Sequence, residues 1–113
     1  IAFMAPSFVF DPDTHDNYDD ISASIASGST DQTLANPAIN IDDTNNRAEF
    51  DADDIALTSQ TITGGTDGVI IYKDTGVAGT STVIAWIEFT EGILTPVVGD
   101  LDITWNTEGI LAI

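Results

Sequence analysis

Short apolar runs alternate with polar connections along the whole chain. In residues 69–73 and 83–89 apolar side chains fall on both faces of an extended chain, a pattern typical of strands that are buried on both faces. In the second run the pattern places Val83 on one face with Ile87 and Phe89. Further on, Leu101, Ile103 and Trp105 alternate with polar residues, so we expect one face of this strand to be wet. A short apolar strand, 110–113, follows.

The first half of the chain gives weaker signals. Residues 1–10 are apolar but contain Pro6, which predicts an edge strand or an interrupted strand. Alternation over 21–25 indicates a further, weak strand. The runs 38–41 and 47–52 flank the sequence DDTNN and predict a hairpin. Residues 55–63 are rich in Thr, Ile and Leu and end at the breaker GGTDG.

Helix is expected to be minor, because no long segment has apolar residues at helical spacing. The one candidate is a turn at 14–21, with Asp13 or Thr14 as its cap. About eight short strands at roughly 8–12-residue spacing predict an all-β, single-domain antiparallel β-sandwich or flattened barrel over residues 1–113. The chain opens on Ile1 rather than Met, inside a predicted strand, so we expect residues upstream of it.

Charge narrows the choice of partners. The chain has 19 acidic residues against Lys73 and Arg47, for a formal net charge of −17. Such a charge repels nucleic acid and anionic membranes. It fits either adaptation to a salty medium or an outer surface that faces a cationic partner. There is no cysteine, hence no disulfide or thiol chemistry, and the apolar runs are too short to span a bilayer.

The acidic stretch DPDTHDNYDD is the one candidate metal site. It fails the EF-hand pattern, because Asp16 stands where the loop needs glycine and Ser22 where it needs glutamate. An irregular calcium site remains a weak candidate, and we prefer a solvated turn, so no cofactor is predicted. The candidate ligands are Asp11, Asp13, Asp16, Asp19 and Asp20.

No pattern of reaction chemistry stands out. His15 is the only histidine, and neither a G-x-S-x-G elbow nor a phosphate loop is present. We therefore predict that the protein is not an enzyme. Tyr72, Trp86 and Trp105 would be the stacking residues of a glycan-binding module, but each lies in an apolar run. Packing in the core is the preferred interpretation for all three.

Several motifs together resemble a family of small virion structural proteins of tailed bacteriophages. They are DTHD at 13–16, NRAEFDADD at 46–54, YKDTG at 72–76, a Gly-Asp step at 99–100, ITWN at 103–106 and GIL at 109–111. The resemblance covers almost the whole chain. The chain departs from the family pattern in two ways. It lacks a basic, helical-looking stretch before the first strand, and its first half is more acidic.

The resemblance implies a virion structural protein. Together with the acidic surface and the absence of a reaction site, it leads us to predict a capsid decoration, or cement, protein on the outer surface of the virion head. The expected partners are the major capsid protein and copies of itself, as a dimer or trimer. The predicted contact elements are residues 1–10 and the 77–82 loop, with side chains Ile1, Phe3, Phe8, Phe10, Val77, Thr80 and Thr82. Two alternatives stay open: a tail or neck protein of the virion, and an extracellular calcium- or glycan-binding β-sandwich module.

Overall fold

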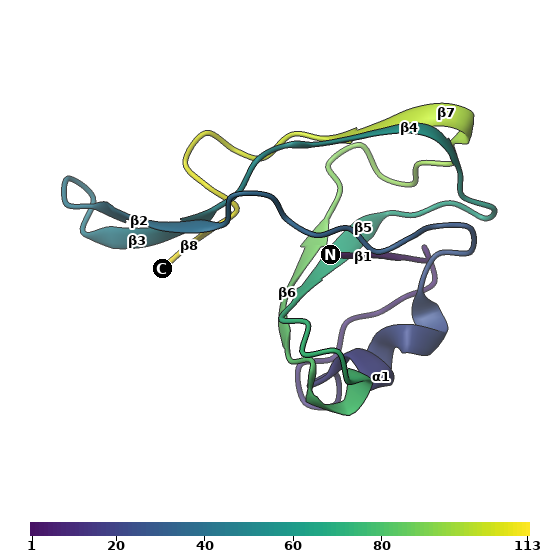
Figure 1. Ribbon diagram of the computed structural model, residues 1–113, viewed down its shortest axis with the longest axis horizontal. Coiled ribbons are helices and arrows are strands. Elements are labelled where there is room, and N and C mark those ends of the chain that lie inside the picture. The colour runs from purple at the N-terminus through teal and green to yellow at the C-terminus, as the bar shows by residue number, and fades with distance from the viewer.

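The computed structural model describes residues 1–113 as eight strands in three antiparallel sheets (Figure 1). The sheet orders are β1-β5-β6, β4-β7 and β2-β3-β8. This confirms the all-β prediction, although the strands form three small sheets. The strands are β1 (Ala2–Met4), β2 (Ala38–Asp42), β3 (Arg47–Asp51), β4 (Ile55–Thr61), β5 (Gly68–Tyr72), β6 (Val83–Glu88), β7 (Val97–Ile103) and β8 (Leu111–Ala112).

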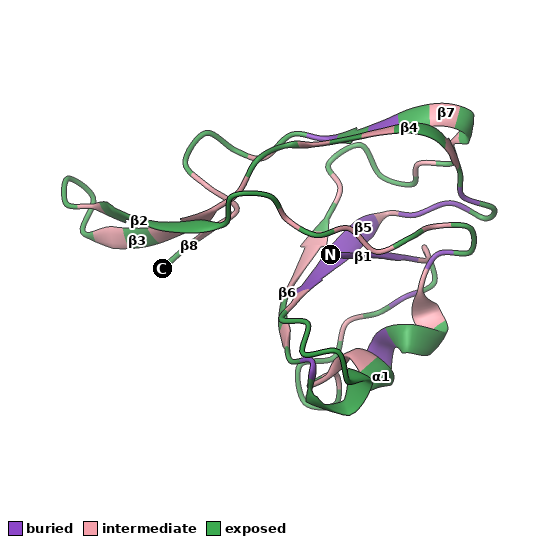
Figure 2. Ribbon diagram, in the orientation of Figure 1, coloured by how far each residue is buried: buried purple, intermediate pink, exposed green.

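Two of the sheets form a two-layer body around a first core cluster. Phe3, Val69 and Ile71 from β1 and β5 pack with Leu101 and Ile103 from β7. The neighbours of Leu101 and Ile103 at positions 100 and 102 are exposed aspartates, so the predicted one-sided strand is confirmed. Figure 2 shows that buried residues concentrate on β1 and β5, at the centre of the body.

The other face of β5 is covered by the N-terminal third of the chain. Ile70 packs there with Met4, Phe8 and Ile21 in a second core cluster. β5 is thus buried on both faces, as its continuous apolar run predicted.

Helical turns cover this second cluster. They are α1 (Tyr18–Ile21) and a 3₁₀ turn at Ser22–Ser24, neither of them long and apolar enough to cross a membrane. The strand predicted at 21–25 is therefore wrong. Ile21 and Ile25 are four residues apart, a spacing that places both on one face of a helical turn, and both contact the second cluster.

The predicted helical turn exists but begins later than expected. Its N-cap is Asn17 rather than Asp13 or Thr14. The Asp20 carboxylate accepts hydrogen bonds from the backbone N–H groups of Asn17 at 2.9 Å and Asp16 at 3.2 Å. An acid at the third helical position that reaches back to the N-cap backbone satisfies an otherwise unpaired donor. The turn therefore starts where Asp20 can reach.

Two strands differ from their predicted patterns. In β6 a register shift pairs Ile71 with Ala85 but Tyr72 with Val83, which leaves Ile84 in a bulge. Val83 consequently packs against the second cluster with Trp86, whereas Ile87 packs against the first. The face predicted for Val83 is wrong for this reason. β7 also begins earlier than the alternating pattern indicated, at Val97.

The third sheet projects from the body as an arm, made of β2, β3 and β8 (Figure 1). The predicted hairpin is confirmed in β2 and β3. Its DDTNN turn is held by Asp42, whose Oδ1 accepts from the backbone N–H groups of Thr44 at 3.0 Å and Asn45 at 3.1 Å. Such bonds from an Asp side chain to the following backbone favour a turn. β8 then pairs with β3 at Glu49 and Phe50.

Candidate functional site

One face of the arm is apolar, and the chain covers it only at its inner end. The cross-strand pairs Ile39–Phe50 and Ile41–Ala48, extended by Leu111 opposite Phe50, share this face. Ile39 is 70% exposed and Ile41 is 79% exposed, while Phe50 packs against the first core cluster. The arm is therefore anchored to the core at Phe50 and presents isoleucine side chains to solvent further out.

The opposite face of the arm is polar and is organised by one cation. The Arg47 guanidinium lies 2.8 Å from Glu49, 2.9 Å from Glu108 and 3.3 Å from Asp42. The hydrogen bond that the Arg47 guanidinium donates to the Glu108 carboxylate is the largest cause that raises the pKa of Arg47. The side-chain hydrogen bond from Asn45, more than Arg47 itself, lowers the pKa of Asp42. Arg47 thus ties β2, β3 and the loop before β8 together.

The arm meets the body at an elbow formed by Asp53, Asp54 and Trp105. The Asp54 carboxylate accepts from the backbone N–H of Trp105 at 2.9 Å. The Trp105 indole N–H donates to the backbone oxygen of Asp53 at 3.1 Å. The Asp53 carboxylate also accepts from the Asn36 side chain at 2.7 Å. These bonds give the FDADD and ITWN motifs a structural role, since they join the chain between β3 and β4 to the end of β7.

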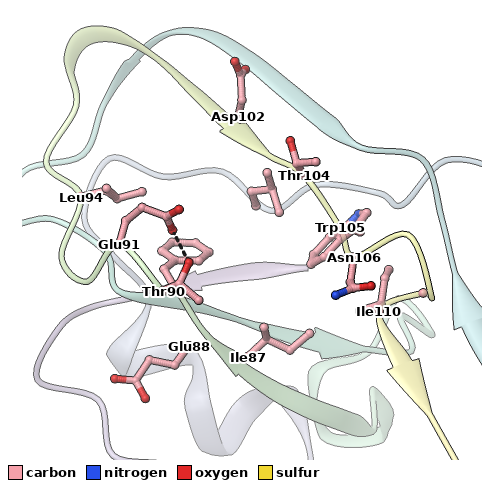
Figure 3. A pocket seen from close by; sticks show the side chains of 13 residues that line it. Ile87, Glu88, Thr90, Glu91, Leu94, Asp102, Thr104, Trp105, Asn106 and Ile110 are labelled. Atoms are coloured by element: carbon pink, nitrogen blue, oxygen red, sulfur yellow. Dashed lines mark hydrogen bonds between the residues drawn. The ribbon is translucent and has the colours of Figure 1, made fainter.

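A groove of about 580 Å³ lies between the body and the elbow (Figure 3). Its apolar floor includes Phe89, Leu94, Trp105 and Ile110, all partly buried against the first core cluster. Figure 3 shows Glu91 beside Thr90, whose hydroxyl donates to the Glu91 carboxylate at 2.9 Å. The lining residues are Ile87, Glu88, Phe89, Thr90, Glu91, Leu94, Asp102, Ile103, Thr104, Trp105, Asn106, Gly109 and Ile110.

The candidate calcium ligands do not come together. No group of three or more acidic, histidine or cysteine side chains is placed to hold a metal ion. Asp20 is engaged at the start of α1, as described above. Asp11 Oδ1 accepts from the backbone N–H of Asp13 at 3.0 Å. Asp11, Asp13, Asp16, Asp19 and Asp20 are all exposed.

His15 stabilises this turn from within. Its Nδ1 accepts from the backbone N–H of Asp11 at 3.0 Å. The imidazole ring also stacks on Phe8, with ring centroids 5.2 Å apart. The residue therefore connects the acidic turn to the second core cluster.

The residues predicted to contact other proteins fall into two groups. Ile1, Phe3 and Phe8 are buried in the two core clusters, so this part of the prediction is wrong. A side chain enclosed by its own chain offers no surface to another molecule. Phe10 is half-buried, whereas Val77, Thr80 and Thr82 are exposed, and their role in contacts stays a prediction.

The three aromatic residues weighed as a stacking platform pack against the core. Trp105 lies against the first cluster, and Trp86 and Tyr72 lie against the second. The Tyr72 hydroxyl donates to the Asp31 carboxylate at 2.6 Å, and its ring centroid is 4.7 Å from that of Tyr18. Burial, and then the Asp31 carboxylate, raise the pKa of Tyr18 to about 12 and raise that of Tyr72 as well.

Sequence reasoning missed both the apolar face of the arm and the groove. The alternation of Ile39 and Ile41 with Asn40 and Asp42 is visible in the sequence and indicates a two-faced strand. It does not indicate that the apolar face lacks a cover. The groove has no local signal, since its lining comes from segments near 87–94 and 102–110 that only the fold brings together.

The chain matches none of the known protein-family models and none of the curated proteins with which it was compared.

Proposed function

We propose that this chain is a virion structural protein of a tailed bacteriophage, a decoration protein that binds the outer surface of the capsid. The observation that carries the proposal is the uncovered apolar face of the arm, where Ile39 and Ile41 are 70% and 79% exposed. The resemblance of the NRAEFDADD and ITWN motifs supports it, because these motifs supply the arm and its elbow. The expected partners are the major capsid protein and copies of this chain.

The energetics favour a role in assembly. Burying an isoleucine side chain that was exposed contributes about 2 kcal/mol. Two such residues on each copy give a modest contact. On a repeating surface, contacts between neighbouring copies add to it, and linked weak contacts produce strong retention. An arm suits this use, since it can reach beyond the footprint of the body.

The surface charge fits the same role. The chain has two basic residues, Arg47 and Lys73, and its formal net charge is −17. An acidic outer layer keeps particles dispersed and does not attract nucleic acid. The proposal therefore predicts that the capsid surface under the arm is neutral or basic.

The test is binding to capsids that lack the protein, followed by sedimentation and cryo-EM. We expect the wild-type chain to sediment with the capsids and Ile39→Asp/Ile41→Asp to lose most of its binding. The matched control is Val97→Asp/Val98→Asp, since these valines are 73% and 74% exposed on β7, at the other end of the molecule (Figure 1). It should bind nearly as well as wild type.

Two results would contradict the proposal. Equal binding by the arm variant and the wild-type chain would remove the arm from the contact. Density on the tail or neck, with bare capsid faces, would favour the alternative location in the virion.

A further inference from the structure

The groove lies between two strands that each lack a neighbour on one side. The only strand that pairs with β6 is β5, and the only strand that pairs with β7 is β4. The outer edge of β6 is occupied at its first residue, Val83, whose N–H donates to the backbone oxygen of Asp16 at 2.9 Å, and it is free further along, beside the groove. Ile87 and Glu88 of β6 lie on one side of the groove, and Asp102 of β7 lies on the other (Figure 3). An unpaired strand edge presents backbone N–H and C=O groups that an extended peptide can pair with.

The floor of the groove continues the core of the body. Phe89, Leu94, Trp105 and Ile110 line it and also pack against the first core cluster. Apolar side chains that enter from outside would therefore meet the same surface that holds the two sheets together. This is the kind of surface that an added strand covers.

The rim of the groove is acidic. Glu88, Glu91 and Asp102 are exposed, and the lining contains no lysine or arginine. None of the three carboxylates forms an ion pair, because the ion pairs of the chain are those of Arg47 with residues of the arm and its loop. Cationic side chains of a ligand would find unpaired counter-charges along the rim.

We propose that the groove binds an extended segment of a partner protein in which apolar residues alternate with lysine or arginine. Successive side chains of a strand point to opposite faces, so the apolar set enters the groove. The flexible basic side chains reach back to the carboxylates of the rim. The backbone of the segment pairs with the open edge of β6. This inference rests on the proposed function, because that function requires a protein partner.

A second copy of this chain is the less suitable occupant. Its apolar arm carries Asp42, Asp43, Glu49 and Asp51, which would meet the acidic rim. Like charges placed together across an interface oppose association. The charge balance therefore selects a basic segment from a different protein.

The test uses a capped peptide of alternating valine and lysine, titrated into the protein at low salt and followed by NMR. We expect shifts in the amide signals of β6 and in the indole signal of Trp105. Glu88→Lys/Glu91→Lys should weaken binding roughly tenfold. Asp43→Lys/Asp51→Lys makes the same change of charge on the arm and should alter the affinity for the peptide less than twofold. A valine–glutamate peptide should not bind.

Three outcomes would overturn the inference. One is equal weakening by the two charge-reversal variants, which would indicate general attraction by the net charge. Another is binding of the valine–glutamate peptide with the same shifts. The third is self-association of the protein alone at high salt that is blocked by the peptide, since the occupant would then be a second copy. The assay needs no capsid, so its failure leaves the capsid-binding test of the proposed function standing.

Discussion

At the scale of single residues, Gly68 allows β5 and β6 to approach each other closely. A Cβ added there would lie 2.4 Å from Cη2 of Trp86 and 2.5 Å from the backbone oxygen of Ile87. The second atom belongs to the backbone of β6 and cannot turn away. We therefore expect Gly68→Ala to lower the free energy of unfolding by about 3 kcal/mol, the upper range for overpacking. Urea denaturation measures this change.

Gly99→Ala is the matched control for that substitution. A Cβ at Gly99 would meet nothing closer than 3.8 Å, and the residue also lies in a strand. It should leave the free energy of unfolding within about 0.5 kcal/mol of the wild-type value, as for ordinary surface changes. Equal effects of the two substitutions would show that the β5–β6 contact is looser than described.

The two tyrosines give a prediction for alkaline pH. Their pKa values in the folded protein lie above the ordinary 10.0, with that of Tyr18 at about 12. The folded state therefore holds these protons more tightly than the unfolded state. The stability they contribute is fully present below pH 10 and is lost as the pH rises through about 12. The chain has no other tyrosine, so phenolate absorbance should report no ionisation near pH 10 and a late, cooperative rise.

The contribution of the Asp31 carboxylate to the raised tyrosine pKa values can be removed by mutation. Asp31→Asn keeps an acceptor for the Tyr72 hydroxyl but removes the negative charge, so ionisation should begin at lower pH than in wild type. A titration that starts near pH 10 in the wild-type protein would contradict the described packing of both rings.

At the scale of elements, the elbow controls how firmly the arm is held. Asp54→Ala removes the acceptor for the backbone N–H of Trp105. The loss of one such bond costs about 1 kcal/mol, which corresponds to roughly fivefold faster local opening. We expect faster hydrogen exchange at the amides of Ala48 and Ile110, which bond across β3 and β8. Amides of β5 should change less.

Two further variants separate the elbow from general loss of charge. Asp54→Asn retains an oxygen acceptor and should exchange at nearly the wild-type rate. Asp43→Ala removes a carboxylate at the tip of the hairpin and should also leave these amides unchanged. Faster exchange in Asp43→Ala of the same size would mean that charge, rather than the bond to Trp105, sets the order of the arm.

Elements that local interactions determine are predicted correctly from the sequence, and elements that distant contacts determine are not. β5 and the hairpin of β2 and β3 are read correctly because local pattern and turn residues determine them. The strand predicted at 21–25 fails because Ile21 and Ile25 fit either period, and packing against Met4 and Ile70 decides between them. The position of Val83 fails because a bulge is set by cross-strand pairing.

The candidate site is harder to predict for the same reason. Nothing near Ile39 or Ile41 in the sequence says that their face stays uncovered, since the cover would have come from distant segments. Equally, the apolar run at 1–10 resembles a contact surface until its residues are seen to fill both core clusters. The role of the acids at 53 and 54 depends on Trp105, about fifty residues away in the chain.

At the scale of the whole molecule, the net charge of −17 makes stability depend on salt. Raising NaCl from about 0.01 M to about 1 M shortens the Debye length from about 30 Å to about 3 Å. Repulsion among exposed carboxylates is then screened, and we expect the free energy of unfolding to rise by about 1 kcal/mol or more. An unchanged or lower urea midpoint at high salt would contradict this account.

Calcium provides the complementary measurement. At constant ionic strength it should shift the midpoint no more than magnesium does, because the aspartates at 11–20 are not brought together. A saturable shift specific to calcium would revive the calcium-binding module as the function.

The way the arm joins the body also has a mechanical consequence. β3 continues into β4, and β7 continues into β8, so both strands of the β4–β7 pair connect to the arm at the same end (Figure 1). A force that pulls the arm away from the body therefore acts on the two strands together and does not peel one from the other. The load passes instead to the apolar layer between β7 and β5, where Leu101 and Ile103 must slide against Val69 and Ile71 before the chain yields.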